Sequence, residues 1–86
     1  MDKPTIPEVL PLIRQFARTP GNEVGGVLHI VLDESNVHDD HVRYCLDLAE
    51  AEGDTLGAEV SRTLLRMSKT QRGRLAGMFY QLQEGK

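Results

Sequence analysis

The sequence predicts an all-α fold, a single compact domain over residues 1–86 that contains about five short helices. Apolar residues recur at helical spacing over most of the chain, and residues that typically start or end helices separate these segments. One apolar run, residues 27–32, also fits a strand, but the chain offers no second convincing strand to pair with it. The alternative is an α+β fold in which a strand at 27–32 pairs across a dimer.

The first helix is predicted to start at a capping box. Thr5 and Glu8 have the S/T-x-x-E spacing in which two side chains satisfy the free backbone N–H groups of a helix start. Pro11 has no N–H group for a helical hydrogen bond, so we expect a short turn up to Leu10 and then a regular helix to about Arg18. The apolar residues at helical spacing are Ile6, Val9, Leu10, Ile13, Phe16 and Ala17.

The run 27–32 is the densest apolar segment of the chain. As a strand it is rich in β-branched residues that alternate between two faces. As a helix it places Val27, Leu28, Val31 and Leu32 on one buried face. Because a lone strand leaves its backbone groups unpaired, we favour a short buried helix.

Three further helices are predicted after residue 36. Polar residues end the apolar run, and a helix starts near His38 or Asp39 and ends at Gly53. Asp54 caps the next helix, and a second capping box over residues 68–71 precedes the last one. Their inward faces are expected to hold Val42, Cys45, Leu46, Ala49, Leu56, Val60, Leu64, Met67, Leu75, Met78, Phe79 and Leu82.

Length and composition indicate a small protein of a reducing compartment. A chain of 86 residues with two Phe, two Tyr and no Trp buries little apolar surface alone, so we expect a homo-oligomer. The single cysteine cannot form an internal disulfide, which suits the cytoplasm. The N-terminus lacks the pattern of a signal peptide, and no apolar segment approaches the roughly 20 residues that cross a membrane. We therefore expect a cytoplasmic protein that does not bind membranes.

Charge is distributed unevenly along the chain. Residues 31–59 carry nine acidic residues and one basic residue, a net charge of −8, whereas residues 60–86 carry one acidic and six basic residues, a net charge of +5. The net charge of the whole chain is only −3. The separation of acidic from basic residues along the sequence therefore says more about possible partners than the net charge does.

The segment around the apolar run resembles a recurrent group of small uncharacterised bacteriophage and prophage proteins. The residues that carry the resemblance are Gly25-Gly26, residues 28–32, Asn36, Asp39, His41-Val42 and Cys45, with further similarity over residues 58–67 and 70–72. A glycine usually stands where this chain has Ser35, so the turn there can differ. The resemblance implies a phage-encoded protein in the bacterial host cytoplasm and implies no reaction.

One candidate site is a zinc centre formed by His29, His41 and Cys45. His41 and Cys45 lie one helical turn apart, and imidazole and thiolate groups are ligands that zinc favours. The spacing matches no zinc signature, and a lone cysteine among apolar residues is more often a small buried side chain. We therefore expect no cofactor, with zinc as the minority alternative. The same pair has no evident oxyanion hole for nucleophilic catalysis.

A second candidate site is a basic stripe, defined as Arg62, Arg66, Lys69, Arg72 and Arg74. Such a stripe can bind an acidic partner or nucleic-acid phosphates. The negative total charge and the lack of interleaved aromatic residues disfavour nucleic acid. We prefer the interpretation that the cations of the stripe pair with the acidic residues of segment 31–59, within the chain or across a dimer.

No catalytic constellation is recognisable in the sequence, so we expect a protein that is not an enzyme. Together with the resemblance, this predicts a small phage accessory protein that binds and inhibits a host or defence factor. A host protein is the expected partner, with a small signalling molecule as another target class. The alternative is a metal-binding or nucleic-acid-binding regulatory protein.

Overall fold

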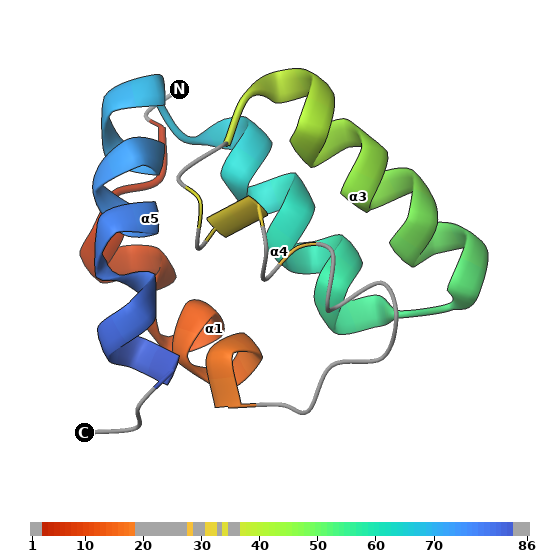
Figure 1. Cartoon of the computed structure of the whole chain (residues 1–86), viewed down its shortest axis with the longest axis horizontal. Helices are drawn as coiled ribbons and strands as arrows, with labels where there is room; N and C mark the ends of the chain where they lie inside the picture. Colours follow the sequence, from red (N-terminus) through yellow and green to blue (C-terminus); the bar gives the residue numbers. More distant parts are fainter. Residues whose placement is uncertain (1–2, 19–27, 29–30, 33, 35–36, 84–86) are drawn as a thin grey trace.

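The computed structural model describes residues 3–18, 28, 31–32, 34 and 37–83. Within these residues the chain forms four bounded helices and no strand: α1 (Ile6–Arg18), α3 (Asp39–Glu52), α4 (Thr55–Arg66) and α5 (Lys69–Gln83) (Figure 1). The predicted all-α class is therefore confirmed. The fifth predicted helix is the run 27–32, and its described residues Leu28, Val31 and Leu32 are helical, not extended.

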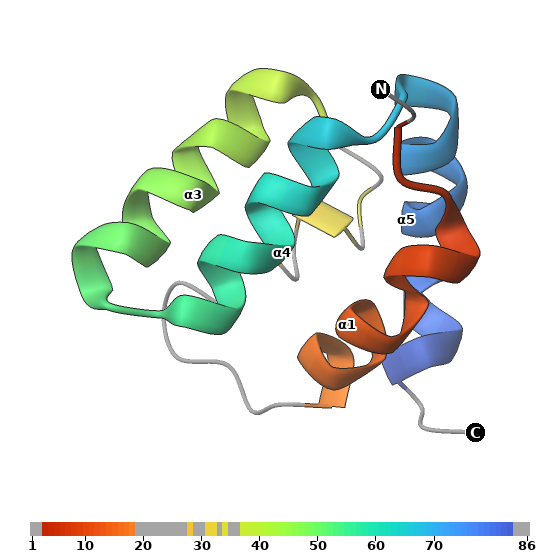
Figure 2. The same ribbon diagram turned by 180° about the vertical axis from the view of Figure 1, so that it is seen from behind.

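Two helix pairs surround the core. Helices α3 and α4 run side by side in opposite directions, and α1 packs against α5 and α4 (Figures 1 and 2). Leu28 and Leu32 are 1% and 0% exposed and belong to the same apolar cluster as residues of all four helices. The helical reading of these two residues places them in the core, as the sequence predicts. The other buried apolar members are Val9, Ile13, Phe16, Ala17, Val42, Cys45, Val60, Leu64, Met67, Leu75, Ala76 and Phe79.

Helix α1 runs unbroken through Pro11, so the predicted separate turn up to Leu10 is wrong. The proline removes one helical hydrogen bond, the one to the carbonyl of Pro7 four residues earlier. Pro7 and Pro11 are both exposed, so water can hydrate that carbonyl at small cost. Burial of Val9 and Ile13 on either side of Pro11 keeps both halves of the helix on the core.

The predicted helix ends are confirmed at several positions. Thr5 donates its backbone N–H to Glu8 Oε1 at 3.1 Å, which is one half of the capping box. Asp54 accepts the Gly57 N–H at 3.0 Å. Gly53 ends α3 with φ 73°, a left-handed conformation that glycine adopts without strain. Ser68 accepts the Gln71 N–H at 3.1 Å and so caps α5.

No helix among the described residues is long and apolar enough to cross a bilayer.

Candidate functional site

The structure separates the members of the predicted basic stripe. Arg72 is buried, with an exposed fraction of 3%, whereas Arg62, Arg66, Lys69 and Arg74 are exposed. The stripe is therefore not one continuous surface of five cations. Arg72 faces the interior because it lies one turn before Leu75 and Ala76 and two turns before Phe79, on the inward face of α5.

The guanidinium of Arg72 joins three segments at one end of the molecule. Its Nη1 donates to the backbone oxygen of Val37 at 2.9 Å and to Oδ1 of Asp39 at 2.6 Å. Its Nη2 donates to the backbone oxygen of Met67 at 3.3 Å. Figures 1 and 2 show the starts of α3 and α5 and the end of α4 at this end of the fold. The guanidinium thus links the segment that leads into α3, the first turn of α3 and the residue after α4.

The Arg72–Asp39 pair is asymmetric in burial. The Arg72 side chain is 4% exposed and the Asp39 side chain is 50% exposed. The hydrogen bond from Arg72, reinforced by its positive charge, lowers the pKa of Asp39 below its ordinary value of 3.8. Arg72 Nε has no hydrogen-bond partner among the described residues, although it is buried. The Nε–H group of Arg72 therefore donates no hydrogen bond to the described residues.

The lowered pKa of Asp39 predicts a pH dependence of stability. A carboxyl group whose pKa is lower in the folded state stabilises the fold above its unfolded pKa, near 3.8, and this stabilisation is lost as pH falls through the lower folded pKa. We expect Asp39→Asn to be less stable than wild type in urea unfolding at about pH 7 and the gap to narrow at about pH 3. Asp40→Asn is the control, because Asp40 forms no ion pair with the described residues. If the difference in stability between wild type and Asp39→Asn stays constant with pH, the pKa of Asp39 is not lowered in the folded state.

A pocket of about 390 Å³ lies beside the ion pair. Among the described residues it is lined by residues 37–40 from the start of α3 and by Lys69, Arg72 and Gly73 from the start of α5. Two helix N-termini and two cations thus border one hollow. This pocket could not be predicted from the sequence, because it depends on how the starts of α3 and α5 come together.

The four exposed cations of the stripe have no ion pair with any described residue. The Arg72–Asp39 pair is the salt bridge found between two described side chains. Within the part of the chain that the structure describes, Arg72 therefore forms an ion pair with the acidic segment. The other four cations of the stripe, Arg62, Arg66, Lys69 and Arg74, form none there. Arg62 lies beside a second, more open hollow of about 520 Å³ between the end of α3 and the start of α4.

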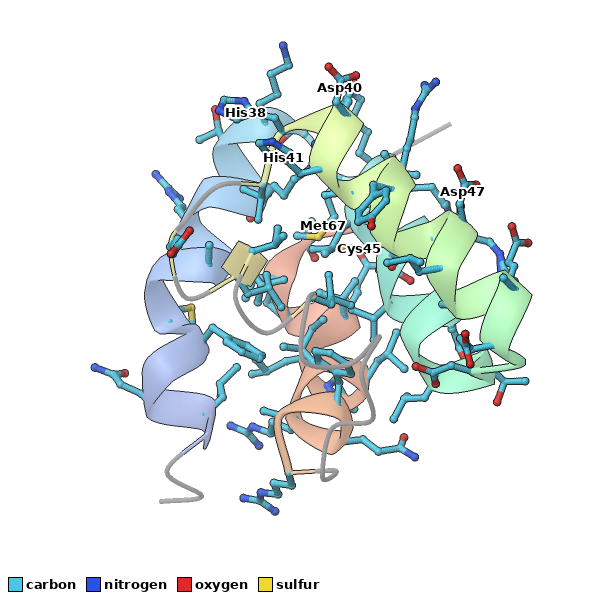
Figure 3. All side chains as sticks on the ribbon, turned by 45° about the vertical axis from the view of Figure 1, so that its right-hand side comes forward. His38, Asp40, His41, Cys45, Asp47 and Met67 are labelled. Carbon is cyan, nitrogen blue, oxygen red and sulfur yellow. The ribbon has the colours of Figure 1, made fainter. Side chains whose placement is uncertain are left out.

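The residues of the minority zinc hypothesis fall into different environments. His29 lies outside the described residues. Cys45 is fully buried, and burial raises the pKa of its thiol, which disfavours the thiolate that binds metal. His41 is exposed at the start of α3, with its ring centroid 5.8 Å from that of His38, whereas Cys45 lies one turn further along the helix in the apolar core (Figure 3). No three metal-ligating side chains come together among the described residues.

Comparison of the chain with protein-family models, with curated proteins and with solved structures finds no match.

Proposed function

We propose that this chain is a non-enzymatic binding protein, a small phage accessory protein that binds and inhibits a host or defence factor. The observation that supports binding is the set of exposed cations, Arg62, Arg66, Lys69 and Arg74, which have no ion pair with the described residues. The phage origin and the host or defence target rest on the sequence resemblance.

The cations of α4 supply the recognition surface. Arg62 and Arg66 are one helical turn apart and exposed, so their guanidinium groups can reach the same partner surface. Arginine pairs with carboxylates through two parallel hydrogen bonds, so an acidic protein surface fits this spacing. We therefore propose a partner protein with an acidic contact surface.

Binding accounts better than catalysis for the placement of the reactive side chains. Cys45, the strongest potential nucleophile of the chain, is fully buried with a raised pKa. Its neighbour one turn earlier, His41, is exposed. This separation supports a protein that acts through its surface.

The proposal is tested by capture from host lysate with the double variant Arg62→Glu/Arg66→Glu. We expect wild type to retain one host protein reproducibly and the double variant to lose at least about 90% of it, because each reversal turns an attraction into a repulsion. The charge dependence is checked in purified components by measuring the association rate at low and high salt. Wild-type association should slow at high salt, and the variant should show little change.

Arg14→Glu/Arg18→Glu is the matched control. Both arginines are exposed and one turn apart on α1, so the change in net charge and the spacing are the same. If both double variants lose the captured protein equally, net charge alone explains capture and the proposed surface is wrong. If Arg62→Glu/Arg66→Glu instead reduces the size of the particle in light scattering and leaves capture intact, the surface serves the proposed homo-oligomer.

A further inference from the structure

The strongest unexplained feature is the pocket of about 390 Å³ at the meeting point of α3 and α5. We propose that it is a second binding site, separate from the α4 cations, that takes the oxyanion group of a small molecule, a carboxylate or a phosphate.

Two helix N-termini border this pocket. Helices α3 and α5 have 14 and 15 residues, and the first residues of both line the pocket. Each N-terminus carries partial positive charge and backbone N–H groups without helical partners, which favour an anion. The His38 side chain, at the cap position of α3, makes no capping hydrogen bond. An anion can therefore take the place that a capping side chain usually fills.

Two cationic side chains add positive charge at the same place. Arg72 is almost completely buried, lines the pocket, and has an Nε–H group without an acceptor among the described residues. The Nε atom itself is enclosed by protein, so Arg72 contributes its positive charge to the pocket, and a bound anion reaches this N–H group only if the side chain shifts. Lys69 is exposed at the rim and forms no ion pair with the described residues, so its ammonium group is available to the same anion.

The two carboxylates at the pocket limit the charge of the ligand. Asp39 is already paired with Arg72 at 2.6 Å, so it repels an incoming anion weakly. Asp40 is exposed and unpaired among the described residues, and it opposes the anion directly. The site therefore favours a singly charged oxyanion over a multiply charged one, and Asp40→Asn should tighten binding.

Gly73 makes the pocket testable without disturbing the core. A Cβ atom added at Gly73 meets no atom within 4 Å, and the residue is exposed on α5, so a larger side chain fits there and obstructs the pocket. Gly77 lies one turn further along the same face. It is also exposed, and a Cβ atom added there also meets nothing within 4 Å, but it does not line the pocket. It provides a matched control.

The experiment is a titration of the full chain with acetate and, separately, with inorganic phosphate, followed by amide chemical shifts in NMR. We expect saturable shifts at Lys69, Gly73 and Asp40. Gly73→Gln should weaken binding about tenfold or more, Gly77→Gln should leave it unchanged, and Asp40→Asn should tighten it about threefold, a change that corresponds to roughly 0.7 kcal/mol. Lys69→Ala, at an exposed position, gives a second test independent of the glycines. Binding of acetate identifies a carboxylate ligand class, and binding of phosphate alone identifies a phosphate class.

The proposal is overturned if neither anion saturates by about 100 mM, a level far above millimolar dissociation constants. It is also overturned if Gly73→Gln and Gly77→Gln bind equally well, because the shifts then come from another place. Neither result affects the proposed function, which depends on Arg62 and Arg66 and is measured by protein capture.

Discussion

Arg72→Ala is expected to lower the free energy of unfolding by about 3 kcal/mol and the melting temperature by about 15 °C. The backbone oxygens of Val37 and Met67 lose their donor. The hydrogen bond to Met67 is buried and the one to Val37 is partly buried, and a buried acceptor left without a hydrogen bond costs about 1–3 kcal/mol. The partner carboxylate of Asp39 is half exposed, so water hydrates it after the change and no buried charge is stranded. Urea unfolding at neutral pH measures the loss.

Two further variants separate the loss of hydrogen bonds from the loss of packing in Arg72→Ala. Arg74→Ala changes the same residue type in the same helix at an exposed position, and we expect an effect below about 0.5 kcal/mol. Arg72→Met keeps the apolar part of the side chain and removes the donors, so it should recover only part of the loss. A methionine variant as stable as wild type would show that packing, not hydrogen bonding, holds the three segments together.

The local features of this fold follow from short sequence patterns. Thr5 with Glu8, Asp54 with Gly57, and Ser68 with Gln71 are pairs three residues apart, so the residues that form each cap can be read from adjacent sequence. The buried faces of α3 and α4 follow from the recurrence of apolar residues in the same way.

The position of Arg72 could not be predicted because its partners are distant in sequence. Val37 and Asp39 lie 35 and 33 residues before it, and no periodic pattern joins them. A weak signal was present, since Arg72 precedes Leu75 and Phe79 at helical spacing and therefore shares their inward face. The pocket beside it likewise depends on the long-range contact between the starts of α3 and α5.

The break predicted at Pro11 was wrong for a related reason. The local rule for proline predicts a break in the helix, whereas the apolar pattern continues across Pro11. Burial of Ile13 and Phe16 after the proline stabilises the continuous helix against the loss of one exposed hydrogen bond. Tertiary packing therefore decides the course of α1, and the same packing makes it sensitive to changes in α5.

Phe79→Ala is expected to have the largest effect on the fold, about 3–5 kcal/mol of unfolding free energy. Phe79 is fully buried on α5, and its ring centroid lies 6.1 Å from that of Phe16 on α1. Truncation removes the apolar surface of the ring and leaves a cavity between these two helices. Small domains have a total stability of about 5–15 kcal/mol, so the variant should lose most of its stability margin in urea. Because α1 packs mainly against α5 and α4, hydrogen exchange should accelerate most in α1.

Tyr44→Ala is the control for the aromatic truncation. Tyr44 is 59% exposed on α3, so loss of its ring should change the free energy of unfolding by less than about 0.5 kcal/mol. A Phe79→Ala variant that unfolds like Tyr44→Ala would contradict the packing of α1 on α5. If Phe79→Ala is destabilised but hydrogen exchange rises equally in all four helices, the core responds as one unit, and α1 is not the part that depends most on this contact.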